Sequence, residues 1–391
     1  MTSTQDFRTK TIFNKRKNVG LDDSWPIAID IGYSGTKIMS PNGLFSFPSY
    51  AIKVSKNQVR LGNIQSTDLI FHDLETDETW FVGAMAQNFM DSDSSEDSEA
   101  TLYNRKRYHS PMFKTISSVG LALGRTENEF SSPKGKQMCI QTGLPPKYIK
   151  SDSKELKKAL AGVYNFELKI GKNPFVKYNF GISENDINIM PQPMGTLFSV
   201  AINNFGDQTK DSKSLFGSNV LIMDAGFGTL DIFSIKNGLI SDSETFDTLG
   251  MKRVMKETTE KIFDNYGKEI PVPAIQRYLE TNKIPCFDPD TMSSNVKPFD
   301  DLLDKSNKMV CMEAINKLKN TYNNLIDIDY LIVTGGTGAA WSSIIKDYFK
   351  NMHTLTIVNG NKNDEIPYIF ANVRGYYMYR YNKLKVLNKK N

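Results

Sequence analysis

One short sequence pattern occurs twice, about half a chain apart. Residues 27–38 read IAIDIGYSGTKI, and residues 220–232 read VLIMDAGFGTLDI. Each copy has an apolar strand, an aspartate, a glycine turn and a returning strand. A supersecondary unit that repeats in this way predicts two domains of common architecture. Because neither domain alone would enclose a ligand, we expect the two copies to face each other across a cleft.

The chain is long enough for two domains. At 391 residues it exceeds the size at which a single hydrophobic core stops growing, and 39% of its residues are hydrophobic. No stretch approaches the roughly 20 apolar residues of a membrane span, and the basic residues 1–24 lack the apolar region of a secretory signal. We interpret residues 1–24 as a flexible leader. Three widely separated cysteines fit a reducing cytosol, so we expect a cytoplasmic protein without membrane contact.

Hydrophobic periodicity and turn residues predict the other elements. We expect an acidic, Ser-rich loop over residues 91–100 and a hairpin from residues 166–170 and 174–180. The same patterns predict helices over about residues 251–266, 275–279 and 309–318, and a closing helix within residues 367–384.

The first copy of the repeat has the composition of an anion site. Glycines in a tight turn let backbone N–H groups approach a phosphate, and polar side chains add donors. The candidate binding residues are Gly32, Tyr33, Ser34, Gly35, Thr36 and Lys37. A carboxylate at Asp30 fits beside a phosphate if hydrated magnesium lies between them. The alternatives are an ordinary hairpin turn and a surface position for Lys37.

The second copy repeats this chemistry. Two opposed glycine turns can hold the β- and γ-phosphates from both sides, and Asp30 and Asp224 can hold a hydrated metal ion through water. The candidate binding residues are Gly226, Phe227, Gly228 and Thr229. Asp231 follows the turn, and we interpret it as a solvent-facing or structural carboxylate.

A third glycine-rich segment follows the apolar strand near residue 332. It consists of Thr334, Gly335, Gly336, Thr337 and Gly338. The last four are candidate binding residues, because glycines allow the backbone to lie against a base and ribose. The helix that follows would present its N-terminus to the α-phosphate.

Together the three segments resemble the phosphate-1, phosphate-2 and adenosine motifs of the actin-like ATPase superfamily, which includes actins, heat-shock chaperone ATPases and sugar kinases. Residues 139–145, CIQTGLP, and the segment INIMPQPMGTLFS are similar to ParM-type plasmid-segregation actins. The chain departs from the usual pattern at Ala225, at Phe227 and in its basic leader.

The resemblance implies an α/β fold of two related actin-like (ribonuclease H-like) domains, each a mixed sheet with flanking helices, around a nucleotide cleft. It predicts domain I over residues 25–198 plus 366–391 and domain II over residues 199–365. The segment 248–250 is expected in the second connection between the domains, with a plain helix start as the alternative.

The resemblance also places Gln192 where the family positions the attacking water. An amide can orient water towards a γ-phosphate without removing its proton, which favours slow hydrolysis. We therefore expect Gln192, Asp30 and Asp224 to form the catalytic set. The alternative is that Gln192 only begins the next helix.

The function implied by the resemblance is a slow, magnesium-dependent ATPase, or GTPase, whose hydrolysis is coupled to polymerisation. Its partners would be further copies of itself and a centromere-binding adaptor, with plasmid DNA contacted only indirectly. A monomeric actin-fold kinase or regulatory ATPase is the alternative. No catalytic aspartate with a sugar pocket and no substrate-binding domain is evident, which disfavours a sugar kinase and a chaperone.

Overall fold

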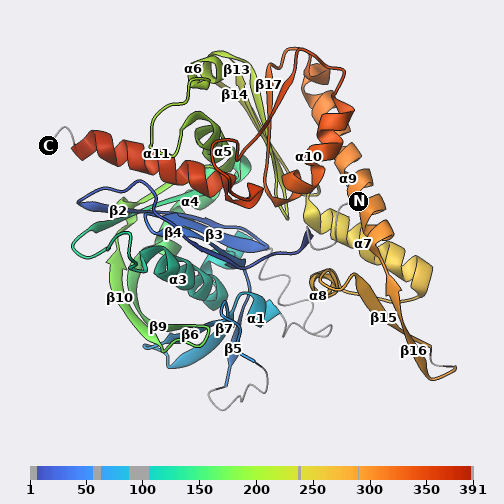
Figure 1. The fold of residues 1–391 in the computed structure, drawn as a ribbon, viewed down its shortest axis with the longest axis horizontal. Coiled ribbons are helices and arrows are strands. Elements are labelled where there is room, and N and C mark those ends of the chain that lie inside the picture. The colour runs from blue at the N-terminus through green and yellow to red at the C-terminus, as the bar shows by residue number, and fades with distance from the viewer. Residues whose placement is uncertain (1–6, 56–62, 88–104, 237–238, 289, 389–391) are drawn as a thin grey trace.

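The computed structural model describes residues 7–55, 63–87, 105–236, 239–288 and 290–388. Two sheets built on the repeated pattern lie one above the other in Figure 1, with helices on their faces. We call the unit around the first of these sheets domain I and the unit around the second domain II. The predicted loop over residues 91–100 lies outside the described residues.

The main sheet of domain I has six strands. In spatial order these are β1 (Ile12–Lys15), β4 (Gly43–Pro48), β3 (Gly35–Ser40), β2 (Ser24–Ile31), β8 (Gln137–Leu144) and β11 (Ile187–Pro191). Strands β2, β3 and β4 form an antiparallel meander, and β8 and β11 continue parallel to β2. β2 is buried along its whole length, as its run of apolar residues predicts.

The sheet of domain II follows the same plan. Its order is β14 (Leu239–Phe246), β13 (Leu230–Lys236), β12 (Val220–Ala225), β17 (Tyr330–Thr334) and β18 (Thr356–Asn359). An antiparallel meander is again followed by two parallel strands. The predicted fold class, two related α/β domains with mixed sheets, is therefore confirmed.

Domain I carries a second sheet of five antiparallel strands, β10 (Val176–Ile182), β9 (Gly162–Ile170), β6 (Leu69–Asp73), β7 (Glu78–Val82) and β5 (Ala51–Val54). The predicted hairpin is confirmed as β9 and β10. Helix α3 (Pro111–Arg125) packs between the two sheets of this domain, and Ser110 caps its first turn. Near it lie α1 (Ala84–Gln87) and α4 (Ile149–Leu160).

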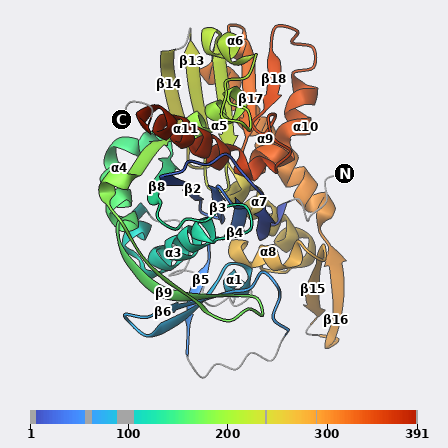
Figure 2. The same cartoon turned by 60° about the vertical axis from the view of Figure 1, so that its left-hand side comes forward.

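Two helices connect the domains. α5 (Gln192–Ala201) leads from domain I into domain II, and α11 (Ala371–Asn388) returns to pack on β2 and β8. Figure 2 shows α5 and α11 together between the two main sheets. A Cβ built on Gly375 would lie 1.6 Å from the carbonyl oxygen of Gly195, so only glycine permits this crossing.

The remaining helices belong to domain II. They are α6 (Ser212–Gly217), α7 (Met251–Tyr266), α8 (Ile275–Tyr278), α9 (Asp300–Thr321) and α10 (Gly336–Tyr348), and the hairpin of β15 (Lys283–Asp288) and β16 (Ser293–Pro298) projects beyond them. The predicted helix over 251–266 agrees with α7, whereas α9 is longer at both ends than the predicted 309–318. Within the described residues, no helix is both long and apolar enough to cross a membrane.

The expectation for segment 248–250 is wrong. This segment joins β14 to α7, and both elements belong to domain II. Gly250 packs against the preceding glycine turn, where a Cβ would lie 2.7 Å from the carbonyl oxygen of Phe227. Close packing, rather than hinge motion between domains, therefore explains the glycine.

The described part of the leader includes a strand and packs on both domains. Residues Ile12 to Lys15 form β1, which pairs with the outer edge of β4. Phe7 is 5% exposed and packs in the core of domain II. The apolar side chains of Phe7, Ile12 and Phe13 gain buried contacts in this way, and a free edge strand gains a partner.

Candidate nucleotide site

A cleft of about 520 Å³ lies between the two domains. This volume is within the range of small-molecule binding sites. Three glycine turns line the cleft, one from domain I and two from domain II. Glycine turns at strand ends can present backbone N–H groups as well as side chains, which suits an anionic ligand.

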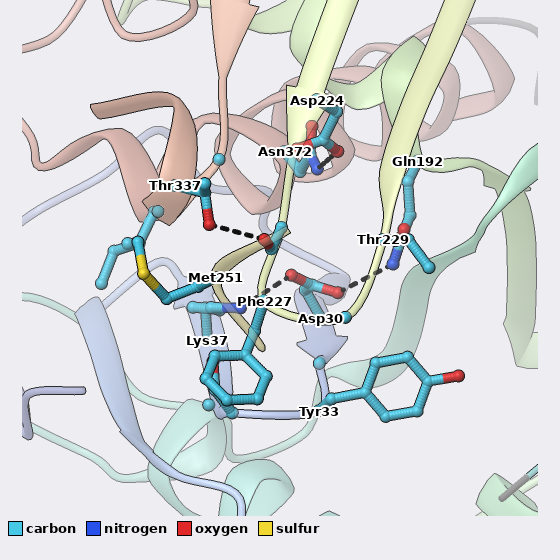
Figure 3. Close-up of a pocket in the computed structure, with 18 of the residues that line it drawn as sticks. Asp30, Tyr33, Lys37, Gln192, Asp224, Phe227, Thr229, Met251, Thr337 and Asn372 are labelled. Carbon is cyan, nitrogen blue, oxygen red and sulfur yellow. Dashed lines mark hydrogen bonds and ion pairs between the residues drawn. The ribbon is translucent and has the colours of Figure 1, made fainter. Parts of the chain in front are cut away.

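Asp30 is the acidic residue of the domain I turn. It lies near the end of β2 and is 6% exposed. The Lys37 Nζ atom lies 3.3 Å from one carboxylate oxygen of Asp30, and the Gln192 side-chain amide donates to the other at 3.3 Å. Figure 3 shows the two side chains reaching Asp30 from opposite sides. Lys37 therefore faces the cleft, which removes the alternative of a surface position.

Asp224 is the corresponding residue of the domain II turn. It lies at the end of β12, is 5% exposed and accepts a hydrogen bond of 2.5 Å from the Asn372 side-chain amide. Burial raises the pKa of Asp224 to about 6, and the negative charge of Asp30 adds to the shift. The two aspartates of the repeat thus lie close enough to repel each other electrostatically.

Asp231 has a structural position. It is 2% exposed and accepts hydrogen bonds from the hydroxyls of Thr229 at 3.0 Å and Thr245 at 2.6 Å. Burial, together with the charge of Asp224, raises the pKa of Asp231 to about 7. The solvent-facing interpretation is wrong, and the bond to Thr229 holds the end of the glycine turn.

The third glycine turn packs directly on the second. Gly335 has φ +84°, and a Cβ there would lie 2.2 Å from the carbonyl oxygen of Ala225. The Thr337 hydroxyl donates to the carbonyl oxygen of Gly226 at 2.6 Å. α10 begins at this point, so its unpaired N–H groups point towards the cleft wall.

Tyr33 connects the two domains inside the cleft. A Cβ built on Gly228 would lie 2.7 Å from the Tyr33 ring, so the ring rests on the domain II turn. The guanidinium of Arg107 lies over the same ring at 4.6 Å and donates to the carbonyl oxygen of Ile31 at 2.7 Å. Arg107 thereby braces the domain I turn.

The domains also touch at one end of the cleft. Lys147 and Tyr148 follow β8 in domain I, and Asp247 follows β14 in domain II. The Lys147 ammonium lies 2.6 Å from the Asp247 carboxylate, and the Tyr148 hydroxyl donates to it at 2.9 Å. These groups are partly exposed, so the contact adds little stability by itself.

The structure brings most of the predicted site residues to one cleft. Those that line it are Asp30, Gly32, Tyr33, Ser34, Gly35, Lys37, Gln192, Asp224, Gly226, Phe227, Gly228, Thr229, Gly335, Gly336 and Thr337. Thr36 and Gly338 do not line it. The Thr36 hydroxyl is buried against Ser49 at 2.9 Å, and Gly338 packs towards Val333 of β17.

Sequence reasoning missed several lining residues. Asn372 lies 148 positions from its partner Asp224 and belongs to no recognisable motif. Arg107, Tyr148 and residues 7–10 were also missed. For residues 7–10 the available signal was the large apolar side chains of Phe7, Ile12 and Phe13 in a mostly polar leader.

The residues present fit a hydrated magnesium ion. Asp30 and Asp224 place two carboxylates on one cleft, and their repulsion contributes to the raised pKa of Asp224. A divalent cation between them would relieve this repulsion. Magnesium keeps several water ligands and binds through one or two carboxylates together with substrate phosphates.

The order of strands and the three turns on one cleft define the actin-like class of two-domain fold. Residues 28–195 match the family model described as the N-terminal domain of actin-like proteins. The resemblance to the actin-like ATPase superfamily, with ParM-type proteins among the similar structures, is confirmed at the level of the fold. None of the curated protein sequences matched the chain.

Three solved structures illustrate the similarity. A 15-stranded ParM filament from Clostridium botulinum has 20% identity and a TM-score of 0.69, covering 92% of this chain and 100% of that one. A non-polymerisable quadruple mutant of pCBH ParM has 22% identity and a TM-score of 0.68, covering 91% and 99%. The archaeal actin homologue Ta0583 in complex with ADP has 15% identity and a TM-score of 0.59, covering 92% and 99%.

Proposed function

We propose that this chain binds a magnesium nucleoside triphosphate, ATP or GTP, in the cleft, hydrolyses it slowly and assembles into filaments. One observation carries the proposal: two matched glycine turns from separate domains bring Asp30 and Asp224 to the same cleft. Such a site can hold a triphosphate only when both domains contribute. Nucleotide state would therefore be coupled to the angle between the domains.

The phosphates would lie between the two glycine turns. Backbone N–H groups of both turns and the ammonium of Lys37 supply positive charge, as phosphoryl transfer requires. The start of α10 supplies further N–H groups for the nucleotide. The ADP complex of Ta0583, which has the same fold, supports this assignment. A magnesium ion held through water by Asp30 and Asp224 would neutralise charge on the transferred phosphoryl group.

Gln192 would orient the attacking water. It is the first residue of α5, lines the cleft and is fixed by its hydrogen bond to Asp30. The water oxygen forms a bond to the γ-phosphorus, the bond from this phosphorus to the bridging oxygen breaks, and the electron pair remains on the β-phosphate. The Gln192 amide cannot accept the proton of the attacking water. This proton is transferred to solvent or to phosphate instead, and hydrolysis is therefore slow.

Filament formation would be the output of this cycle. Head-to-tail contacts repeat without closing, and a change in domain angle alters them in every subunit. The similarity to the ParM filament from Clostridium botulinum supports self-assembly. By the same similarity we propose that a centromere-binding adaptor links the filament to plasmid DNA, which the chain itself would contact only indirectly.

Light scattering and phosphate release, measured together, test the proposal. On addition of ATP or GTP with magnesium, scattering should rise and then fall as phosphate is released, and chelation of magnesium should abolish both signals. Phosphate release with flat scattering at tens of micromolar protein would overturn filament formation and favour a monomeric kinase or regulatory ATPase. Absence of nucleotide binding would overturn the whole assignment.

A further inference from the structure

The first described residues run from one domain to the other. In Figure 1 the start of the chain, in dark blue, passes from the main sheet of domain I towards α7. Its domain I end is β1, whose four residues pair with β4. The hydroxyl of Ser46 in β4 donates to the carbonyl oxygen of Lys10 at 3.1 Å, which extends this attachment beyond the strand.

The other end is held by domain II. Phe7 is 5% exposed inside a cluster whose other buried members all lie at Leu221 or later. The Thr9 backbone N–H donates to the Gln276 side-chain oxygen at 3.2 Å, and Arg8 forms an ion pair of 3.0 Å with Glu280. A ring, a hydrogen bond and an ion pair thus fasten three consecutive residues to domain II near α8.

The chain between the two attachments is too short to allow the domains to separate at this point. Thr9 is bonded to domain II and the next residue, Lys10, is bonded to domain I. One extended residue spans at most about 3.6 Å. If the domains separate by more than a few ångströms at this point, one of the two attachments must break.

The same segment is a wall of the cleft. Residues 7–10 and Ile12 line it together with the glycine turns. The Thr9 methyl lies 3.3 Å from the position of a Cβ on Gly35, so the segment passes directly beside the domain I turn. Arg8 and Lys10 bring two cations to this side of a site that would hold a triphosphate.

We propose that residues 7–15, which we call the strap, close one side of the cleft and that release of Phe7 from domain II limits nucleotide exchange. This inference rests on the proposed function, because it assigns the strap to the same nucleotide site. Bound nucleotide leaves after the Phe7 ring leaves its pocket. The strap therefore lengthens the lifetime of the nucleotide on the protein.

The strap opens at its domain II end. Its domain I end has a four-residue ladder and the packing of Phe13 against Phe45, whose ring centroids lie 6.2 Å apart. At the domain II end, Glu280 is 59% exposed in its side chain, so its ion pair with Arg8 is weak, and the buried Phe7 ring and the Thr9–Gln276 hydrogen bond resist release.

Displacement of a fluorescent ADP analogue, followed by stopped flow in the presence of magnesium, tests the strap. Phe7→Ala is expected to speed dissociation at least about tenfold, since loss of 1.4 kcal/mol of holding energy gives this factor. Phe205→Ala is the matched control, because Phe205 is 75% exposed and does not line the cleft. A rate for Phe7→Ala within twofold of the unaltered protein would overturn the strap.

A second measurement predicts slower rather than faster dissociation, so a destabilised variant cannot produce the expected result. Thr9→Cys and Gln276→Cys, joined by a short bismaleimide in a Cys286→Ser background, should slow dissociation at least about tenfold. Each single cysteine treated alike should release the analogue no more slowly than the unaltered protein. Unchanged dissociation in the joined protein would overturn the strap while leaving the proposed function intact. Failure of the unaltered protein to bind the analogue would instead overturn the proposed function.

Discussion

The two aspartates of the repeat occupy equivalent positions but have different neighbours. Asp30 lies beside the ammonium of Lys37, 3.3 Å away, whereas Asp224 is bonded to the neutral amide of Asn372. The charge of Asp30 is thus partly balanced within domain I. That of Asp224 is buried, and among the described residues no cation is in hydrogen-bond contact with it; burial raises the pKa of Asp224 to about 6, although the charge of Lys37 opposes the rise. The two copies of the repeat therefore place their aspartates in different electrostatic surroundings.

This difference gives the two residues separate roles in the proposed cycle. A buried carboxylate without a paired cation gains most when a divalent ion arrives, because desolvation and repulsion are then both relieved. Asp224 should therefore dominate the response to magnesium. Asp30, held by Lys37 and Gln192, should instead fix the water-positioning amide and the domain I turn.

The largest expected effect comes from Asp224. Asp224→Ala should lower magnesium-dependent phosphate release at least about 100-fold, the usual consequence of removing a group that stabilises developing charge. Phosphate release under saturating nucleotide measures this. The control is Asp242→Ala, which removes an exposed carboxylate from β14, away from the cleft lining. Unaltered turnover in Asp224→Ala would refute its assignment.

The next effect concerns Gln192. Gln192→Ala should slow phosphate release by about tenfold to 100-fold, below the range typical of groups that transfer a proton. Nucleotide affinity should stay within a few fold, because the glycine turns remain. Polymer lifetime, followed by light scattering after a single addition of nucleotide, should lengthen in parallel. If phosphate release is normal, Gln192 only begins α5.

The stability of the ligand-free protein separates the two aspartates most directly. Asp224→Asn should raise the free energy of unfolding at pH 8 by about 1–3 kcal/mol, since one pKa unit corresponds to about 1.4 kcal/mol. Asp30→Asn should lower it by about 1–3 kcal/mol, because the mostly buried Lys37 loses its carboxylate partner. Urea unfolding of both variants measures the difference. The same sign for both would contradict the electrostatic contrast.

The smallest effect is a pH dependence. In the folded protein Asp224 and Asp231 keep their protons up to about pH 6 and about pH 7, whereas unfolded aspartates lose theirs near pH 4. Between these values the folded state binds more protons, so the free energy of unfolding falls as pH rises. Above the folded-state pKa values this contribution is constant.

Urea unfolding at several pH values from 4 to 8 measures this slope. Asp231→Asn should make the free energy of unfolding depend less on pH. Asp30→Asn should lower the pH at which the contribution of Asp224 becomes constant, because the charge of Asp30 contributes to the raised pKa of Asp224. If the free energy of unfolding of the unaltered protein rises with pH over this window, or if neither variant changes its slope, other groups control the pH dependence.

Much of the site could be predicted because its residues are close together in sequence. Asp30 and the glycines that follow, and Asp224 and its glycines, lie in continuous segments in which strand, turn and strand specify one another. Thr36, which was also predicted to bind, does not line the cleft. Side chains alternate across a strand, and Thr36 points to the buried face where Ser49 lies.

What was missed depends on contacts between distant parts of the chain. Asn372 meets Asp224, and Phe7 packs in a core formed more than 200 residues later. A mostly polar leader with a few apolar side chains does not reveal which surface it will cover. The extra length of α9 follows similarly from burial against domain II, which outweighs its weak apolar periodicity.

The crossing of α5 and α11 has a mechanical consequence. Because Gly195 and Gly375 have no side chains, the backbones of α5 and α11 are in direct contact at this point, and one helix can rotate against the other there. Asn372, whose side-chain amide donates a hydrogen bond to Asp224, lies less than one helical turn from Gly375 along α11. α11 has 18 residues, so it extends about 27 Å. A small rotation of α11 at its start, near the Asp224 carboxylate, would therefore move the C-terminal end of the helix by a much larger distance.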